Sequence, residues 1–401
     1  MLEIKGNYTN AIIYCDELDE ASISQIYQVC NQKSMENCKI VMMPDVHMGS
    51  SCCVGTTIQL SDCVIPSLVG VDIGCGMEVV KLRETHIELA RLDKFIHQKI
   101  PSGGNIHESE KKERITSGLK QLYCYDHIDE LRANKSLGTL GGGNHFIEID
   151  KDEDGSLYLI IHSGSRHLGV EVATYYQKLA FDNINGCDEK TLSALKQELK
   201  AKGKQHQYAN EVKKLKNTKQ TELPYLFAYL KGEEMEHYLH DIAIVQEYAC
   251  LNRMIMAKAI MKYMKLHAVK QFTTIHNYID MEQRILRKGA ISAKKDEIMI
   301  IPLNMRDGSL LCRGKGNPDW NYSAPHGAGR AMSRSEAKQS FSLSAYKKEM
   351  KDIYSTSVNA STLDECPMAY KNAEQIKQAI QNTAQILSVL KPIYNFKAGK
   401  D

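Results

Sequence analysis

The stretch VGVDIGCGM, residues 69–77, places a carboxylate and a thiol among three glycines in an apolar segment. Asp72 and Cys75 therefore stand where core residues are expected. Either the turn is only tight and buried, or its two polar side chains hold a ligand. A carboxylate and a thiolate combined with neutral imidazoles would suit a divalent transition metal such as zinc, manganese, iron or cobalt.

Histidines beside three strand-like segments could complete such a metal site. His145 opens the alternating segment HFIEI, and His162 follows the apolar run 157–161. His276 follows a third run, 272–275. Strand ends hold side chains more firmly than free loops do, and a metal site requires such rigidity. Each histidine alone is more often a hydrogen-bonded core residue, but their coincidence favours a metal site in which one thiolate could bridge two ions.

A loop of different composition, SAPHGAGRAMSR at residues 323–334, contains His326 followed by small residues and two arginines. Small residues allow backbone amides to approach a phosphate closely, and arginine offers a rigid fork of donors to phosphate oxygens. His326 could donate a hydrogen bond to a phosphate, or attack phosphorus once its nitrogen is deprotonated. The alternative is a tight loop with a structural histidine.

Short apolar runs bounded by turn residues predict the strands that must position these side chains. These runs are residues 40–43, 78–82, 157–161, 272–275 and 298–301, with 145–149 as a half-buried strand. Helical patterns cover residues 234–266 and 371–390. No linker rich in proline, glycine or serine divides the chain, and no internal repeat is visible. We therefore predict one mixed α/β (α+β) domain over residues 1–401, with a β-sheet core and surrounding helices.

A segment rich in lysine and glutamine, residues 189–220, carries a helical pattern from 192 to 219. It predicts a helical insertion in this domain. A solvated helical hairpin would account for its composition. The alternative is a basic arm that faces an anionic partner.

Composition limits the class of protein. The 401 residues are 43% hydrophobic and 25% charged, as in soluble globular proteins, and the net charge of +2 excludes a strongly basic nucleic-acid coat. The 12 cysteines include no CxxC pair. The N-terminus lacks the apolar stretch of a signal peptide, and no apolar run approaches the ~18 residues of a membrane span. We expect a cytoplasmic protein with buried free thiols and no membrane association.

Taken together, the motifs resemble the RtcB family of RNA ligases. The match runs in order through PDVHMG (44–49), VGVDIGCGM (69–77), GTLGGGNHFIEI (138–149), HSGSRHLG (162–169), EYACLNR (247–253), HNY (276–278), RKGA (287–290), SAPHGAGRAMSR (323–334), PMAYK (367–371) and Lys397. The resemblance implies an enzyme that joins RNA 3′-phosphate or 2′,3′-cyclic phosphate ends to 5′-hydroxyl ends, with GTP and two manganese ions. It also implies that His326 takes GMP as a covalent intermediate and passes it to the RNA 3′-phosphate.

The resemblance also assigns the other site residues. It implies that the metal ligands are Asp72, Cys75, His145, His162 and His276, with Cys75 as the bridge. It implies that the nucleotide is bound by Asn144, Phe146, Glu148, His276, Asn277, Asn304, Ser309, His326, Gly327, Ala328, Gly329, Tyr370 and Lys397. Arg166 and Arg330 are candidates for contacts to RNA phosphates, because the guanidinium fork matches phosphate geometry.

Two places depart from the usual family pattern. Residues 303–306 read Leu-Asn-Met-Arg where the family usually has Gly-Ser-Met-Gly, so that Asn304 replaces a serine that touches the nucleotide. Residues 48–51 read Met-Gly-Ser-Ser where a second glycine is usual. These departures concern nucleotide geometry and substrate preference rather than the metal site. The pattern resembles a divergent branch, some members of which are paired with a release-factor-like protein and repair damaged ribosomal RNA.

The predicted partners are therefore broken RNA, GTP and, for that branch, a release-factor-like protein or the ribosome. We expect a monomer. Two other functions remain open from the residues: a metal-dependent hydrolase of RNA ends, such as a cyclic phosphodiesterase, that does not ligate, and an RNA-binding factor or partner subunit without catalysis.

Overall fold

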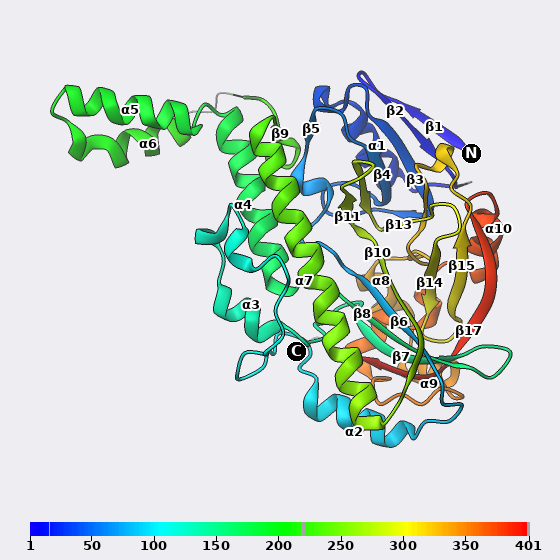
Figure 1. Ribbon diagram of the computed structural model, residues 1–401. Helices are drawn as coiled ribbons and strands as arrows, with labels where there is room; N and C mark the ends of the chain where they lie inside the picture. Colours follow the sequence, from blue (N-terminus) through cyan, green and yellow to red (C-terminus); the bar gives the residue numbers. More distant parts are fainter. Residues whose placement is uncertain (16, 218–220, 399–401) are drawn as a thin grey trace.

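The computed structural model describes residues 1–15, 17–217 and 221–398 (Figure 1). Helices and strands are mixed along the chain, which confirms the predicted α+β class. The helices are α1 (Glu20–Cys30), α2 (Leu89–Lys99), α3 (Glu130–Ser136), α4 (Arg166–Ile184), α5 (Glu189–Ala201), α6 (Tyr208–Asn217), α7 (Glu233–Met264), α8 (Arg334–Ser340), α9 (Leu343–Glu349) and α10 (Ala373–Ala379).

A seven-stranded antiparallel sheet holds most of the predicted strands. Its order is β10 (Ala268–Ile275), β6 (Gly76–Leu82), β8 (Leu157–Ser163), β7 (Phe146–Lys151), β17 (Ala384–Lys397), β15 (Gly308–Gly314) and β14 (Ile298–Asn304). The strands predicted at 78–82, 145–149, 157–161, 272–275 and 298–301 are all confirmed, as part of β6, β7, β8, β10 and β14.

A second, six-stranded sheet contains the strand predicted at 40–43. Its order is β1 (Leu2–Lys5), β2 (Asn10–Ile13), β3 (Lys39–His47), β4 (Val54–Gln59), β12 (Ile285–Lys288) and β11 (Asn277–Asp280), and only β2 and β3 pair in parallel. Two short pairs join β13 (Ala290–Ser292) to β16 (Ser323–Pro325) and β5 (Cys63–Val64) to β9 (Leu230–Lys231).

Strand register brings four of the predicted ligands to the same end of β10, β6, β8 and β7. Gly76 pairs with Ile275 on one side and with Ser163 on the other, so Cys75, His276 and His162 lie at one level. Phe146 pairs with His162, which brings the preceding His145 to the same level. Hydrogen-bonded neighbouring strands lie about 4.8 Å apart, so these side chains converge.

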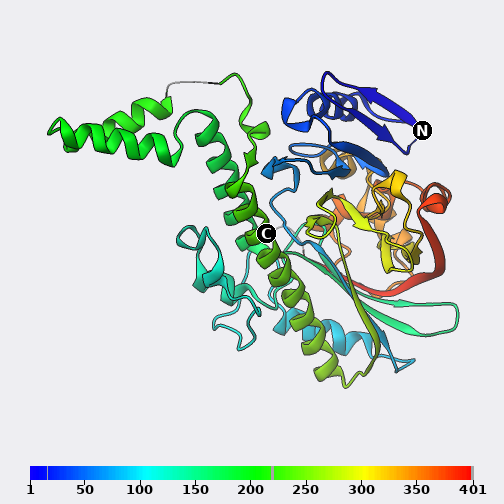
Figure 2. The same ribbon diagram turned by 45° about the horizontal axis from the view of Figure 1, so that its top comes forward.

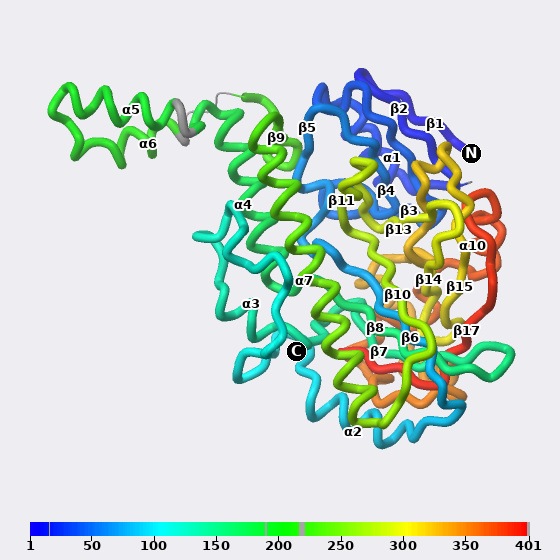
Figure 3. Tube along the Cα trace, in the orientation of Figure 1, coloured from blue at the N-terminus to red at the C-terminus, as the bar shows by residue number. Residues whose placement is uncertain are grey.

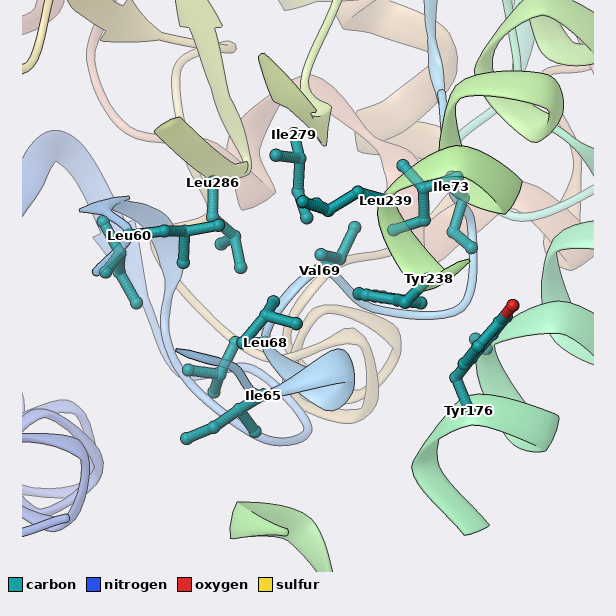
Figure 4. Close-up of a cluster of buried hydrophobic side chains, with 14 of the residues drawn as sticks. Leu60, Ile65, Leu68, Val69, Ile73, Tyr176, Tyr238, Leu239, Ile279 and Leu286 are labelled. Carbon is teal, nitrogen blue, oxygen red and sulfur yellow. The ribbon is translucent and has the colours of Figure 1, made fainter. Parts of the chain in front are cut away.

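The long helix α7 packs against two of the strands that carry these residues. It contacts β6, β8 and α4, and runs beside α4 (Figures 1 and 3). The predicted helix 234–266 is thereby confirmed within about two residues at its C-terminus. Val69 and Ile73, two of the apolar residues around Asp72, point into a buried cluster with Leu239 of α7 and Ile279 of β11 (Figure 4), whereas Val71 is exposed. The apolar part of VGVDIGCGM therefore anchors the turn that carries the polar part.

The helix predicted at 371–390 is wrong in its second half. Only Ala373–Ala379 is α-helical, followed by a single 3-10 turn at Ile380–Asn382, and the chain then enters β17. β17 pairs with β15 along its first half and with β7 along its second. These two pairings override the local helical pattern, because each satisfies backbone hydrogen bonds that a helix would have satisfied internally.

The predicted helical insertion is a two-helix hairpin, α5 and α6. Both helices pack against the short turn between them and against each other. The end of the predicted pattern, residues 218 and 219, lies outside the described residues. In the described part of the chain, no helix combines the length and apolar character needed to cross a membrane.

A pair of leucines tests the strand assignment of β17. Leu390 is fully buried, whereas Leu387 is 40% exposed. In a helix the two would share a face, being three residues apart. We expect Leu390→Ala to lower the free energy of unfolding by about 2–5 kcal/mol, and the control Leu387→Ala to change it by less than about 1 kcal/mol. Urea unfolding of both variants measures this, and equal losses would contradict the strand.

Candidate active site and metal centre

Five polar side chains meet at the strand ends. Cys75 Sγ lies 3.4 Å from His145 Nε2 and 3.3 Å from His162 Nε2. His145 Nε2 lies 3.1 Å from Asp72 Oδ2, and His162 Nε2 lies 3.3 Å from His276 Nε2. Two groups of three, Asp72–Cys75–His145 and Cys75–His162–His276, each have ligand atoms within 4.8 Å of one another. Cys75 belongs to both groups.

The second ring nitrogens of two histidines are fixed by backbone carbonyls. His145 Nδ1 lies 2.8 Å from the carbonyl oxygen of Leu140, and His162 Nδ1 lies 3.2 Å from that of Asn144. A proton on Nδ1 leaves the lone pair on Nε2, which faces the cluster, as in histidines that bind metals. The backbone also fits closely, because a Cβ at Gly164 would lie 2.0 Å from Asp72 Oδ1.

The protonation states of His162, His276 and Cys75 are compatible with binding of a cation. Burial, with His145 as the second cause, lowers the pKa of His162 well below its ordinary value, and burial with His326 does the same for His276. Both imidazoles are therefore neutral at neutral pH, the form that binds metals. Burial and the neighbouring Asp72 raise the pKa of the Cys75 thiol. A bound cation reverses that preference and makes the thiolate a ligand.

A cavity of about 870 Å³ opens beside the cluster. Its wall includes most of the predicted site residues: Asp72, Cys75, Asn144, Phe146, Glu148, His162, His276, Asn277, Asn304, His326, Gly327, Ala328, Gly329, Arg330, Tyr370 and Lys397. His145 reaches the metal cluster without lining the cavity. Ser309 is buried and its hydroxyl has no hydrogen-bond partner among the described residues, so the structure does not bring it into the cavity wall.

His326 is held by a carboxylate that sequence reasoning did not assign. Its Nδ1 lies 2.6 Å from Asp45 Oδ2, and its backbone N–H donates to the same oxygen at 3.2 Å. Asp45 is fully buried at the end of β3. The contact leaves Nε2 as the unengaged ring nitrogen, and the ring centroid lies 5.0 Å from that of His276. The only signal in the sequence was the PDVHMG motif itself.

Comparison with known proteins agrees with this geometry. The sequence model of a family described as "tRNA-splicing ligase RtcB" matches residues 25–398. The chain belongs to the RtcB family. It is 30% identical over 392 residues to the RNA-splicing ligase RtcB of Escherichia coli (strain K12), with 88% of each chain covered. It is 27% identical to the RNA-splicing ligase RtcB2 of Escherichia coli (strain ATCC 25922), which covers 95% of this chain and 93% of the relative.

A relative of lower identity is matched over a still larger share of this chain. The tRNA-splicing ligase RtcB of Aeropyrum pernix is 24% identical, with 96% of this chain and 94% of the relative covered. The family assignment therefore applies to almost the whole chain rather than to one motif.

A second carboxylate, Glu365, fixes two residues of the cavity wall, Tyr370 and Lys397, in this RtcB family chain. Lys397 Nζ and the Tyr370 hydroxyl each donate to Glu365 Oε2 at 2.6 Å, and Arg334 lies 2.7 Å from Oε1. Burial alone would raise the pKa of Glu365, but Lys397 and Arg334 lower it to about 2. The predicted nucleotide contacts Tyr370 and Lys397 are thus fixed by a residue that no sequence motif indicated.

Glu148 lies deeper in the same cavity and is paired with a second acid. Its Oε2 accepts a hydrogen bond from Asn395 Nδ2 at 2.8 Å. Burial raises the pKa of Glu148 to about 7 and raises the pKa of the neighbouring Asp150 well above its ordinary value. Two buried carboxyl groups in contact cannot both ionise easily, so this pair retains a proton at neutral pH.

The two predicted RNA-binding arginines already have protein partners. Arg166 donates to Thr139 Oγ1 at 3.1 Å and to the Gly103 carbonyl at 2.7 Å. Arg330 donates to the carbonyls of Met332 and Asp364. Arg330 lines the cavity and Arg166 does not, so their contact with RNA stays a prediction.

The departure at residues 303–306 covers the last two residues of β14 and the start of the turn that leads to β15. Asn304 Oδ1 accepts hydrogen bonds from the backbone N–H groups of Arg306 and Asp307, and its Nδ2 donates to Asp307. Arg306 pairs with Asp307 and Glu349. Asn304 lines the cavity, but its side-chain amide forms hydrogen bonds within the turn. The added positive charge of Arg306 is likewise paired with protein carboxylates.

The shared thiol yields a prediction about metal binding. We expect Cys75→Ala to weaken the binding of a divalent metal ion more than about 100-fold, because loss of a residue that only orients a ligand already costs about 10- to 100-fold. Calorimetric titration with Mn²⁺ measures it. The control Cys312→Ala removes a thiol from a separate buried cluster and should leave affinity unchanged. Equal affinity in Cys75→Ala would return VGVDIGCGM to a structural turn.

Glu365 yields a prediction about acid stability. Its pKa is depressed from 4.5 to about 2, so its ionised form stabilises the fold above pH 4.5, and this contribution is lost as the pH falls toward 2. We expect Glu365→Gln to lower the free energy of unfolding at neutral pH by roughly 3 kcal/mol, and to abolish that part of the pH dependence. Urea unfolding across this range measures it. The exposed Glu374→Gln is the control, and parallel curves for Glu365→Gln and wild type would contradict the assignment.

Proposed function

We propose that this chain is an RNA ligase that uses GTP and manganese to join RNA 3′-phosphate or 2′,3′-cyclic phosphate ends to 5′-hydroxyl ends. Its relatives are named as RNA- or tRNA-splicing ligases, which supports the ligase class. The observation that carries the proposal is the position of His326, held by Asp45 in the wall of a cavity that also contains the metal-type cluster.

The proposed nucleophile is His326 Nε2. With Nδ1–H donating to the Asp45 carboxylate, the lone pair lies on Nε2, and the anionic partner favours the cation that forms on attack. Nε2 attacks the α-phosphorus of GTP, a nitrogen–phosphorus bond forms, and the bond to the β-phosphate oxygen breaks with release of pyrophosphate. Gly327, Ala328 and Gly329 follow directly and give a phosphate close access to the backbone.

Two further transfers complete the proposed reaction. An oxygen of the RNA 3′-phosphate attacks the same phosphorus and breaks the bond to His326, which places GMP on the RNA end. The 5′-hydroxyl of the second RNA then attacks the 3′-phosphorus, a phosphodiester forms, and GMP leaves. A 2′,3′-cyclic phosphate requires prior hydrolysis to a 3′-phosphate. A manganese pair held by the two groups that share Cys75 would polarise the phosphate and neutralise charge developing on it.

The remaining cavity residues would bind the guanylate. Phe146 offers an aromatic face, over which Lys397 Nζ lies 5.7 Å from the ring centroid. Glu148 offers a carboxyl group at depth. We assign the same role to Asn144, Asn277, Tyr370 and Asn304, which all line the cavity. Ser309 does not line it, so its contact with the nucleotide stays a prediction from the resemblance. We propose transfer RNA or damaged ribosomal RNA as the substrate. We predict that the protein is a monomer and acts in the cytoplasm. If it belongs to the divergent branch, a release-factor-like protein is its predicted partner.

Covalent labelling tests the nucleophile. Incubation with Mn²⁺ and GTP labelled on the α-phosphate should label the wild-type chain, and His326→Ala should abolish the label. Asp45→Asn should slow labelling by about 10²- to 10⁴-fold with metal affinity retained, because it removes the group that orients the ring. The control His267→Ala changes an exposed histidine paired with Glu84 and should label normally. A labelled His326→Ala would rule out this nucleophile.

Ligation assays separate ligase from hydrolase. An RNA with a cyclic phosphate end and a second RNA with a 5′-hydroxyl should yield a joined product only with GTP. Cyclic phosphate opened without a joined product would instead favour the hydrolase, which needs the metals but not His326.

A further inference from the structure

The hairpin of α5 and α6 concentrates positive charge. Its described side chains, residues 191–215, include six lysines and two glutamates, in a chain whose formal net charge is only +2. All six lysines are exposed: Lys196, Lys200, Lys202, Lys204, Lys213 and Lys214. This segment holds no arginine, tryptophan or phenylalanine, and its aromatic side chains are His206 and Tyr208.

Most of this charge is not neutralised within the protein. Glu198 pairs with Lys202, and Glu211 pairs with Lys214. The other four lysines form no ion pair with any described residue. Lys196 and Lys200 are four residues apart on α5, where like charges destabilise a helix. The segment therefore retains repulsion that an anionic partner would relieve.

The hairpin stands out from the rest of the molecule (Figures 1 and 2). Leu199 is buried, and Leu195 and Val212 are half-buried. The two helices therefore pack against each other through their apolar residues, and their lysines face solvent. α5 continues the chain from α4, which begins at Arg166, four residues after the cluster residue His162. At about 1.5 Å per residue, the 19 residues of α4 carry the chain about 28 Å away from the site.

We propose that the α5–α6 hairpin is a second RNA-binding surface, which holds the phosphate backbone of a structured RNA whose broken end lies in the cavity. This inference rests on the proposed function for the nature of the end, but the contact itself does not require catalysis. Lysines bind phosphates as point charges, so the contact is independent of sequence. RNA with long duplex flanks gains from it, whereas ends of a few nucleotides do not reach the hairpin.

A charge variant tests this surface. The quadruple change Lys196→Gln, Lys200→Gln, Lys204→Gln and Lys213→Gln removes the lysines that lack ion pairs. Its matched control removes four exposed lysines from α2 and α7, outside the hairpin: Lys94, Lys99, Lys258 and Lys262, each to Gln. Both variants lower the net charge equally, so a non-specific charge effect would appear in both.

The readout is binding of a hairpin RNA with a duplex flank longer than α4, titrated at several salt concentrations without GTP. Each lost phosphate contact lowers the slope of log affinity against log salt by about 0.9. We expect the hairpin variant to lose about 2–4 units of slope and to bind roughly 10- to 100-fold more weakly near 0.1 M salt. Circular dichroism and labelling by GTP should match wild type in both variants.

The outcomes are distinct. Unchanged RNA affinity and slope in the hairpin variant, or an equal loss in the control, would overturn the proposal and leave an acidic protein as the partner. Equal weakening on RNA ends of a few nucleotides would also overturn it, because such ends do not reach the hairpin. A third outcome separates the two proposals. If GTP does not label the wild-type chain, but the hairpin variant binds RNA more weakly than wild type and the control variant does not, the proposed ligase function fails and the RNA-binding surface stands.

Discussion

The site depends on one buried cation. Arg253 of α7 is fully buried, and its guanidinium donates to the carbonyls of Gly74 at 2.8 Å and Ser163 at 2.9 Å. It therefore ties the turn that carries Cys75 to the end of the strand that carries His162. No carboxylate of the described residues lies within ion-pair distance of it. A buried charge without a counter-ion is costly. The acidic groups near enough for this cation to favour their ionisation are the Cys75 thiol and the Glu78 carboxyl group.

The neighbouring Asn252 completes this support. Its Oδ1 accepts from the backbone N–H of Gly138, and its Nδ2 donates to the carbonyl of Gly164. Two adjacent residues on one helix thus fix three separate loops of the site. Such a rigid frame suits phosphoryl transfer, in which positioning and charge stabilisation contribute most of the catalysis.

Local patterns in the sequence were sufficient for six of the strands, and they singled out the residues that meet in the cluster, because apolar runs and strand-end histidines are visible within a few residues. Asp45 and Glu365 could not be found in this way. Asp45 meets His326 across 281 positions, and Glu365 meets Lys397 across 32, so neither contact leaves a local signature. The helix predicted over the first residues of β17 is wrong for the same reason, since pairing with β15 and β7 sets the conformation of this segment rather than its own residues.

The thiol shared between the two groups also affects how ions would enter. Without a cation beside it, the Cys75 thiol is protonated, because burial and the neighbouring Asp72 raise its pKa well above the ordinary value. A cation held by either group would have to displace that proton, and the other group would then contain a thiolate. The two groups would therefore not behave as independent sites, because the ionisation of the one thiol that they share affects both.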